Sequence, residues 1–388
     1  MQESNKIDKF PYKKYHSIKH NINTLFDNLI NFKPELKQTQ KYKIFNSDKF
    51  ANRDLISNTF DNNSDINYYQ FINNDDENYE TINILSDYFS EKCRMKCKRY
   101  DMIRSPFETF NNNNELNKLI NELKVANQEI TPYNLRELLY KHGECANFKL
   151  TLAKSIYDYF DAKRILDFSA GWGDRLISAI AYNNNSEIDY YDGFDPSECM
   201  AKYYNKIINK LANKNQQEKF GVIKLPFEKV ILTRTYNLVF TSPPFFVLEI
   251  YNNDATQSTA KYTTTKSWFC NMLCVWLVKA WTNLEYDGHM VINIEDIIKD
   301  YGPNKTKMLF TEAMILFISG FCKHALFKGV IGHSNTHKSH IVRPLWVWKK
   351  TKLQEKQQEQ QSTFRERFKT QYKEEYNDLV DVLDLHNI

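Results

Sequence analysis

Short apolar runs alternate with longer amphipathic stretches along the middle of the chain, from about residue 145 to residue 350. Short runs rich in aliphatic and aromatic residues are typical of buried strands, whereas apolar residues spaced three or four apart are typical of helices. Strands that alternate with helices predict an α/β fold, with a mostly parallel sheet and helices on both faces. The expected strands are 164–170, 188–195, 220–226, 236–244, 288–295, 324–332 and 340–348, and the expected helices are 174–182, 198–212, 267–284 and 307–320.

The two ends of the chain differ from this middle part. Residues 1–140 are rich in Asn, Asp, Lys and Tyr, and polar tracts such as NNDDEN predict loops between helical segments. Residues 351–388 combine dense charge with weak apolar spacing, which predicts a polar linker followed by a helix. We therefore expect a mainly helical or irregular N-terminal extension at 1–140 that is a candidate for substrate binding, an α/β domain at 141–350, and a C-terminal linker and helix.

Composition and charge limit the choice of partners only weakly. A chain of 388 residues with 42% hydrophobic residues can bury two cores. A net charge of +4 does not require a polyanionic partner, although it would not repel one. The most basic segment before the α/β domain is either a solvated helix face or a surface that contacts phosphates. It contains Lys92, Arg94, Lys96, Lys98, Arg99 and Arg104.

The cysteines and histidines give no clear metal site. Seven cysteines without a secretory leader predict free thiols in a reducing, intracellular compartment, and no apolar run is long enough to predict a membrane partner. Cys93 and Cys97 could form half of a zinc site, but no matching second pair follows. The loop that holds His333, His337 and His340 lacks an accompanying Cys or carboxylate, so we expect no metal and favour substrate contact, for which Lys338 and Arg343 are candidates.

A glycine turn follows the first expected strand. In RILDFSAGWGDRL, Asp167 ends the strand, Gly171 and Gly173 lie in the turn, and a helix begins at Asp174. Glycine permits tight backbone torsions and the close approach of a ligand, and the start of a helix presents free N–H groups. Because any tight strand-to-helix turn can use this pattern, it indicates only a nucleotide-like ligand at the junction.

A second acidic residue, Asp195, ends the next expected strand, within GFDPSE. A carboxylate at that position can accept hydrogen bonds from a ribose diol. Carboxylates at two adjacent strand ends, Asp167 and Asp195, favour an adenosine ligand. The alternative is that both side chains only cap the helices that follow them.

The fourth expected strand ends in a diproline, within NLVFTSPPFF. Two consecutive prolines restrict the backbone and could hold the neighbouring side chains rigidly at the strand end. The alternative is that the segment simply ends a strand and begins a loop. A polar stretch rich in Ser and Thr follows at 247–269, where we expect a mobile loop over a binding pocket.

Together, the segments ECANFK, DFSAGWGDRL, FDPS, TSPPFF and RPLWVW resemble class I S-adenosylmethionine-dependent amino-methyltransferases of nucleic-acid bases, in particular phage and giant-virus DNA methylases. The resemblance covers residues 140–350 and implies a Rossmann-like seven-stranded methyltransferase sheet with a closing hairpin. It also implies S-adenosylmethionine as the cofactor, with Glu228 as one candidate near the adenine amine. The cofactor-binding residues that it implies are Phe148, Asp167, Phe168, Ser169, Gly171, Gly173, Asp195, Pro196, Pro226 and Phe227.

The diproline matches the (D/N/S)PP(Y/F/W) signature of this family in Ser242, Pro243, Pro244 and Phe245, which the resemblance makes the catalytic residues. An exocyclic amine is a poor nucleophile because its lone pair is delocalised into the ring, so it must be oriented. The Ser242 side chain and the Pro243 carbonyl could accept its two hydrogens while Phe245 stacks on the base. Ser in the first position departs from the Asp or Asn that is usual for adenine, and it leaves the target base open.

The resemblance implies methyl transfer to an exocyclic amino group of adenine or cytosine in DNA, and a viral protein in its host cell is one interpretation. One alternative is an RNA base or cap methyltransferase, with the guanine 2-amino group as a further target. The other is a catalytically inert, nucleic-acid-binding subunit, which the undamaged glycine turn and diproline disfavour. DNA is favoured over RNA as the partner, and the sequence indicates no oligomeric state.

Overall fold

The architecture of the chain was obtained as a computed structural model. It describes residues 7, 9–13, 21–33, 35–38, 67–72, 81–99, 102–141, 143–252, 255–299, 306–308, 310–334 and 342–385. The predicted substrate-contact residue Lys338, together with His337 and His340, lies outside the described residues.

One sheet of nine strands forms the centre of the molecule, in the order β1–β2–β12–β13–β9–β7–β4–β5–β6. The strands β4, β5, β6, β7 and β9 run parallel, and β13 is antiparallel to both of its neighbours. All seven predicted strands are present, so the predicted α/β sheet and its closing hairpin are confirmed. Their bounds are Arg164–Asp167 (β4), Tyr190–Phe194 (β5), Phe220–Ile223 (β6), Tyr236–Thr241 (β7), Leu284–Asn293 (β9), Ala325–Ser334 (β12) and Val342–Lys350 (β13).

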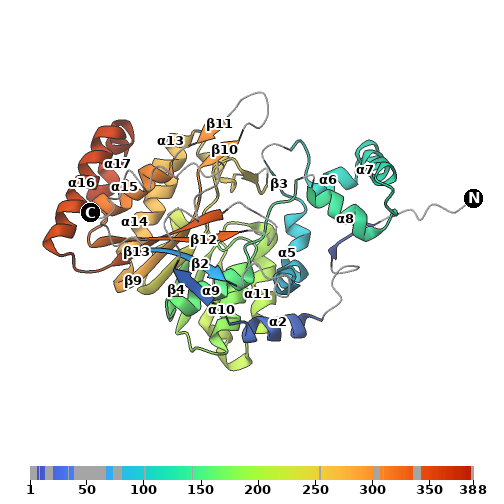
Figure 1. Ribbon diagram of the computed structural model, residues 1–388, viewed down its shortest axis with the longest axis horizontal. Helices are drawn as coiled ribbons and strands as arrows, with labels where there is room; N and C mark the ends of the chain where they lie inside the picture. Colours follow the sequence, from blue (N-terminus) through green and yellow to red (C-terminus); the bar gives the residue numbers. More distant parts are fainter. Residues whose placement is uncertain are drawn as a thin grey trace, which may run out of the picture.

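Helices cover both faces of this sheet (Figure 1) because successive strand residues point to opposite faces and both sets are apolar. Leu166, Val239 and Ile292 enter one core, with α14, α15 and the π-helical segment η4, whereas Ile165, Leu238 and Val291 enter the other, with α9, α10 and α11. The bounds are Leu150–Tyr159 (α9), Asp174–Asn183 (α10), Glu198–Leu211 (α11), Phe269–Cys274 (η4), Val275–Thr282 (α14) and Thr311–Phe321 (α15). Shorter elements are Lys214–Lys219 (η2), Phe227–Lys229 (η3), Ser258–Lys261 (α12), Thr265–Trp268 (α13), Ile297–Lys299 (β10) and Thr306–Met308 (β11).

The N-terminal extension is built into this fold in two places. It contributes β1 and β2, with β2 pairing parallel to β12, and it places α2, η1 and α5 in the core shared with α9 and α10. The helices α6, α7 and α8 form a small core of their own, seen on the right in Figure 1. The bounds are Ile22–Asn31 (α2), Glu35–Gln38 (β1), Asn67–Ile72 (β2), Thr81–Ser86 (η1), Asp87–Arg94 (α5), Lys98–Arg99 (β3), Pro106–Phe110 (α6), Asn113–Val125 (α7) and Pro132–Lys141 (α8).

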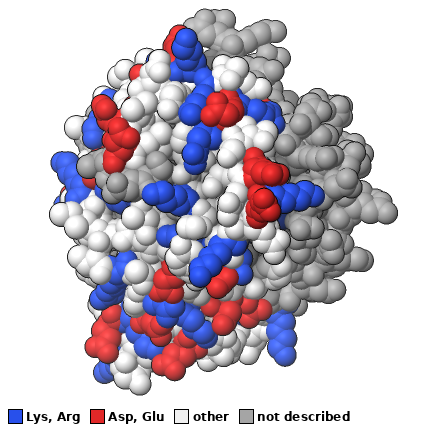
Figure 2. Space-filling model, turned by 90° about the vertical axis from the view of Figure 1, so that its left-hand side faces the viewer, with Lys and Arg blue, Asp and Glu red and all other residues white. Residues whose placement is uncertain are grey.

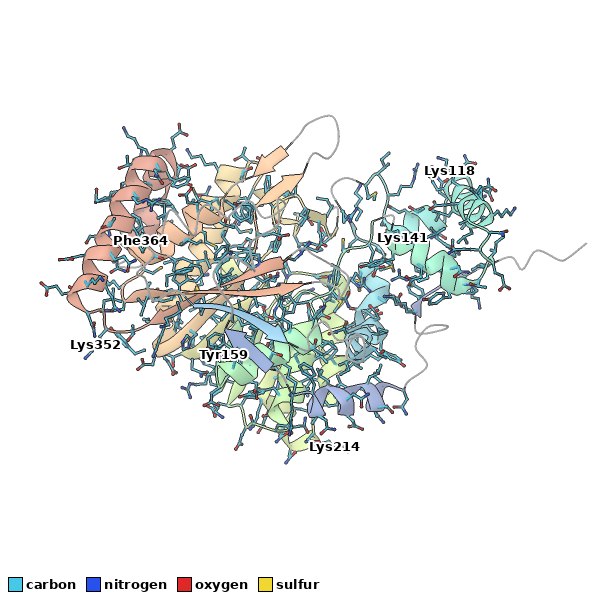
Figure 3. All side chains as sticks on the ribbon, in the orientation of Figure 1. Lys118, Lys141, Tyr159, Lys214, Lys352 and Phe364 are labelled. Carbon is cyan, nitrogen blue, oxygen red and sulfur yellow. A yellow bond between two sulfur atoms is a disulfide. The ribbon has the colours of Figure 1, made fainter. Side chains whose placement is uncertain are left out.

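The C-terminal segment is more helical than its sequence predicts. Two helices, α16 (Glu355–Gln371) and α17 (Lys373–Leu385), pack against α15 and η4 through buried residues such as Phe364 (Figure 3) and Phe368. Acidic and basic side chains are interspersed over this side of the molecule (Figure 2), and pairs such as Lys266 with Asp378 connect them. Among its described residues, this face therefore carries no single-sign patch of the kind that a polyanion would need.

One prediction about the cysteines was wrong. Cys93 in α5 forms a disulfide with Cys199 in α11, so it is neither a free thiol nor a ligand for a zinc ion. Cys97 and the four other described free cysteines are buried. Within the described part of the chain, no three His, Cys, Asp or Glu side chains gather as a metal site would require. No described helix has the length and apolar character needed to cross a bilayer.

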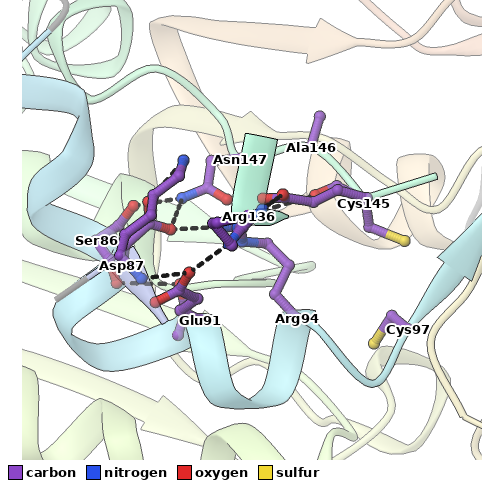
Figure 4. A network of polar contacts seen from close by, with 12 residues as sticks. Ser86, Asp87, Glu91, Arg94, Cys97, Arg136, Cys145, Ala146 and Asn147 are labelled. Carbon is purple, nitrogen blue, oxygen red and sulfur yellow. Dashed lines mark hydrogen bonds and ion pairs between the residues drawn. The ribbon is translucent and has the colours of Figure 1, made fainter. Parts of the chain in front are cut away.

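A buried network of charges connects α5 and α8 to the segment just before α9 (Figure 4). Arg136 donates from Nε to Glu91 at 2.9 Å and from an Nη atom to Glu144 at 2.5 Å. Arg94 contacts both Asp87 and Glu144. Burial alone would raise the pKa of Asp87, but Arg94, Lys13 and Arg136 lower it to about 2. Arg94, predicted to belong to a basic surface, is thus buried and paired with carboxylates inside the protein.

Removing one member of this network should strongly destabilise the fold. Arg136→Met leaves Glu91 buried without its cation and leaves Glu144 with Arg94 alone, and we expect it to lower the free energy of unfolding by about 3–5 kcal/mol. The control is Arg234→Met, which breaks an exposed pair with Asp192 and should cost about 1 kcal/mol or less. Urea denaturation followed by tryptophan fluorescence measures both, and equal losses would contradict the buried network.

Candidate active site

A cavity opens at the carboxyl edge of the parallel strands, where β4 and β7 lie side by side. The chain leaves β4 toward β5 on one side and returns to β7 on the other, and such a reversal of strand order is where open α/β sheets bind ligands. The structure brings ten of the fourteen predicted site residues into the lining. These are Phe148, Phe168, Ser169, Gly171, Asp195, Pro196, Ser242, Pro243, Pro244 and Phe245.

Asp167, predicted to bind the cofactor, does not line the cavity. Its carboxylate is fully buried and accepts hydrogen bonds from Arg175 at 2.8 and 3.1 Å, from the Tyr191 hydroxyl at 2.7 Å and from Thr241 at 2.8 Å. These donors come from α10, β5 and β7 respectively. Asp167 therefore joins the elements that surround the cavity, and both of its oxygens already have partners.

The two glycines of the turn have different tasks. Gly173, with φ of +82°, precedes α10, and a Cβ there would lie 2.7 Å from Ile207 of α11, so it permits close helix packing and does not line the cavity. Gly171, with φ of +57°, faces the cavity, and a Cβ there would meet only the Ser169 carbonyl oxygen, at 3.7 Å. Space for a ligand therefore begins at the Gly171 backbone.

The Asp195 carboxylate forms the neighbouring wall at the end of β5. Its two oxygens accept main-chain N–H groups of Gly171 at 2.9 Å and Ser197 at 2.8 Å, which fixes the carboxylate against the glycine turn. Burial raises the pKa of Asp195 to about 6, against the lowering effect of those two N–H donors. Each oxygen retains a second lone pair that can accept a ligand hydroxyl.

Phe148 closes the cavity on the side of the N-terminal extension. Its N–H donates to Asp174 at 3.2 Å, and its ring lies 5.5 Å from the Arg175 guanidinium and 5.6 Å from the Phe240 ring. The wall continues through Asn147, whose amide donates to Ser86 at 2.5 Å. The segment before α9 is thus held from behind by residues of the extension.

The diproline projects from the end of β7 into the cavity. The Ser242 hydroxyl lies between Asn293 atoms of the neighbouring strand β9, at 2.9 Å from its side-chain nitrogen and 3.3 Å from its carbonyl oxygen. Phe246 has a φ of +45°, an unfavourable value for a bulky side chain, and its buried ring packs against Trp268. This backbone strain follows directly after Phe245 and turns the chain sharply at the cavity.

The polar segment after the diproline, predicted as a mobile loop, is partly folded. Its first part, β8 (Glu249–Ile250), pairs antiparallel with β3 of the extension. Glu249 lines the cavity, accepting from the Ala146 N–H at 3.1 Å and from the Tyr251 hydroxyl at 2.9 Å, and burial raises its pKa. The extension therefore helps to build the far wall of the cavity.

Three residues proposed after β6 lie outside the cavity lining. Phe227 is buried and stacks on Phe168 with ring centroids 5.0 Å apart, so it supports the wall from behind, next to Pro226. Glu228 pairs with Lys261 at 3.0 Å. No described residue of the loop between β6 and β7 lines the cavity, so the contact with the cofactor that the resemblance implies for this loop stays a prediction.

Several lining residues were not predicted as site residues, and of the three named next only Trp172, between the two glycines of the turn, lies in a motif. Asn293 ends β9, Trp276 lies in α14, and Trp172 contacts Tyr251 with ring centroids 5.8 Å apart. For Asn293 and Trp276 the strand-end or apolar position gave the only signal, whereas the glycine turn could have indicated Trp172. His333 and Arg343 also line the cavity, in agreement with the predicted contact role of their hairpin, and Arg343 pairs with Glu295 at 3.1 Å.

The lining suits a ligand that is both aromatic and polar. Within the described part of the chain, the buried Ser169 hydroxyl oxygen and the Trp276 indole nitrogen have no hydrogen-bond partner, although both residues line the cavity. Aromatic side chains lie beside them, and the Asp195 carboxylate and the Gly171 backbone are close by. An adenosine group, with a flat base and a ribose diol, matches this set of donors, acceptors and apolar surfaces.

Comparisons with known proteins add little to this geometry. No protein-family model matches the chain, and no curated protein is significantly similar to it. Among solved structures, it is similar to the O-methyltransferase of a trans-AT PKS multienzyme of Brevibacillus brevis in complex with S-adenosyl-L-homocysteine, with 10% identity, 59% of this chain and 82% of that chain covered, and a TM-score of 0.36. It is also similar to TrmN from Thermus thermophilus, with 10% identity, 52% of this chain and 49% of that chain covered, and a TM-score of 0.33. A methyltransferase from Pyrococcus furiosus is similar with 14% identity, 52% of this chain and 83% of that chain covered, and a TM-score of 0.33. Similarity this low carries no argument about function.

The raised pKa of Asp195 should appear in the pH dependence of stability. The folded carboxyl titrates near 6 and the unfolded one near 3.8, so its stabilising contribution is complete below pH 3.8 and is lost as the pH rises through 6. Relative to wild type, Asp195→Asn should therefore gain stability between pH 4 and pH 7, on the order of 1 kcal/mol because the group is only partly shielded from solvent.

Urea denaturation at several pH values measures this difference. Glu285→Gln is the control with the opposite sign, since the hydrogen bond from Arg164 lowers the pKa of Glu285, and its contribution is lost as the pH falls. If the stability difference from wild type changed with pH in the same direction for both variants, the raised pKa of Asp195 would be contradicted.

Proposed function

We propose that the chain is an enzyme that transfers a methyl group from S-adenosylmethionine to an exocyclic amino group of a nucleic-acid base, adenine or cytosine in DNA. The observation that carries the proposal is the single cavity that Gly171 and Asp195 share with the Ser242–Phe245 diproline segment. One half of this cavity suits an adenosine donor, and the other half suits a planar amine.

The donor half is formed by the ends of β4 and β5. The Asp195 carboxylate accepts the ribose hydroxyls, and the Gly171 backbone allows the ligand to approach closely. Phe148 and Phe168 supply aromatic surface next to the reacting centre, where a ring face stabilises a cation. When bound there, S-adenosylmethionine supplies an electrophilic methyl group on a positively charged sulfur.

The acceptor half is formed by the diproline and the walls beyond it. The Ser242 hydroxyl oxygen and the Pro243 carbonyl accept the two amine hydrogens, and Phe245 stacks on the base. These contacts favour a pyramidal nitrogen, whose lone pair is localised on the nitrogen instead of delocalised into the ring. With S-adenosylmethionine bound, the amine nitrogen would take the methyl group, the electron pair of the carbon–sulfur bond would stay on sulfur, and one amine proton would leave to water.

A base inside a duplex cannot reach the bottom of this cavity, so the enzyme acts on a base that is swung out of its stack or already unpaired. Ser242 is shorter than the Asp or Asn usual in adenine-specific relatives, and cytosine is therefore a target as well supported as adenine. The walls beyond the diproline, which include Glu249 and Tyr251, would contact the ring edge.

The proposal is tested by incubating the full chain with labelled S-adenosylmethionine and duplex DNA, single-stranded DNA or RNA, followed by mass spectrometry of the product nucleosides. We expect methylated deoxyadenosine or deoxycytidine, and a loss of about 100-fold in kcat for Ser242→Ala. Ser186→Ala, in the loop between α10 and β5, is the control and should retain wild-type activity. Labelled RNA alone would transfer the proposal to RNA, and no product from any substrate would refute the enzymatic proposal.

A separate measurement tests the donor half. Asp195→Ala removes the ribose acceptor and should weaken the binding of S-adenosylhomocysteine by about 10- to 100-fold, the effect of losing hydrogen bonds to a charged group. Isothermal titration calorimetry gives the Kd, and Asp189→Ala, at the amino end of β5, should leave it unchanged. Tight binding without any methylated product would favour the inert-subunit alternative.

A further inference from the structure

The Ser242 hydroxyl is held by one residue of the neighbouring strand. Strands β7 and β9 run parallel with Thr241 opposite Ile292, which brings the next residues, Ser242 and Asn293, side by side. The Asn293 amide nitrogen donates to the Ser242 hydroxyl oxygen at 2.9 Å, and that hydroxyl donates to the Asn293 carbonyl oxygen at 3.3 Å. Asn293 is only 9% exposed, although its side chain is polar, and it follows the buried apolar residues 290–292 of β9.

The Asn293 amide is itself oriented by a third residue. Its side-chain oxygen lies 3.2 Å from Nε2 of His333, which belongs to β12 and is 8% exposed. An amide oxygen can only accept, so Nε2 of His333 must carry a proton in this pair. With its oxygen engaged by His333, the amide directs its NH₂ group toward Ser242.

These contacts decide what Ser242 can do in the cavity. A serine hydroxyl has one proton and two lone pairs. The proton is directed to the Asn293 carbonyl oxygen, and one lone pair accepts from the Asn293 amide. One lone pair is left, so Ser242 can act toward a ligand only as a hydrogen-bond acceptor.

The direction of this hydrogen bond is critical for an amine that must act as a nucleophile. A hydroxyl that rotated freely could donate its proton to the amine lone pair, and it would then occupy the electrons that attack the methyl group. A hydroxyl that only accepts binds an N–H hydrogen and leaves the lone pair available. An ionised aspartate has no proton to donate to the amine. A serine hydroxyl has one, so a neighbouring group must direct that proton away from the amine.

We propose, on the basis of the proposed function, that Asn293, oriented by His333, is a positioning residue that fixes Ser242 as an acceptor for the target amine. Asn293 acts through Ser242, so its removal matters only when the serine is present. Removing Asn293 should slow methyl transfer without weakening the binding of the methyl donor. In this chain the pair Ser242–Asn293 replaces the single acidic or amide side chain that is usual at the start of the signature.

The test is a double-mutant cycle in the full-length protein, with Ser242→Ala, Asn293→Ala and the double variant acting on the nucleic acid that wild type labels. Asn293→Ala alone should lower kcat by about 10- to 100-fold, with less than a twofold change in KM and in the Kd of S-adenosylhomocysteine. In the Ser242→Ala background, the same change should lower kcat by less than about threefold. Multiplicative losses in the double variant would overturn the proposal.

Two further variants separate positioning from a structural role. Asn237→Ala removes an amide at the amino end of β7 that accepts from the Lys163 and Arg164 N–H groups, and it should lower Tm but preserve kcat. His333→Gln can still donate to Asn293 and should retain more activity than His333→Leu. Equal activity of the two His333 variants would contradict the role of the imidazole.

A spectroscopic readout does not depend on catalysis. In ¹⁵N-histidine-labelled protein without ligands, the His333 Nε2 resonance, assigned by its loss in His333→Gln, should show a bound proton and should shift in Asn293→Ala. An unprotonated Nε2 overturns the hydrogen-bond chain even if methyl transfer is detected. If wild type labels no nucleic acid, the proposed function fails, and this spectrum still decides whether the chain of hydrogen bonds exists.

Discussion

The buried carboxylate of Asp167 is the interaction on which the candidate site depends. It accepts hydrogen bonds from α10, β5 and β7 at the point where the strand order reverses. A buried carboxylate is stable only when charged or polar partners hydrogen-bond to it. The positions of Arg175, Tyr191 and Thr241 are therefore tied to that of Asp167. The glycine turn, Asp195 and the diproline all begin within a few residues of these partners, which explains how side chains distant in sequence reach one cavity.

A second constraint comes from the N-terminal extension. The buried ion pairs of Arg94 and Arg136 with Glu144 fix the start of the segment that carries Asn147 and Phe148 to the cavity (Figure 4). On the other side, the pairing of β3 with β8 fixes the chain just after the diproline. Two walls of the cavity thus depend on residues before position 140, so the extension shapes the site as well as adding strands to the sheet.

The donor-facing and acceptor-facing residues of the cavity come from the ends of different strands of the same sheet. The residues expected to face the donor lie at the ends of β4 and β5, and those expected to face the acceptor lie at the ends of β7 and β9. Because neighbouring parallel strands end at the same edge, the two groups are held at a fixed separation by the hydrogen bonds of the sheet. Rigid placement of this kind is what the orientation of a poor nucleophile requires.

The sequence by itself determined the order of the elements and the two motifs, because both are local. Apolar periodicity locates strands and helices, glycine and proline act on their own backbone torsions, and ten of the fourteen predicted site residues line the cavity. Only the tertiary structure decided the orientation and partners of each side chain. Asp167 turned inward to Arg175, Cys93 met Cys199, and Asn293 reached Ser242 across a strand pairing that no local pattern encodes. The physical reason is that burial and hydrogen-bond satisfaction are settled between segments that lie far apart in the chain.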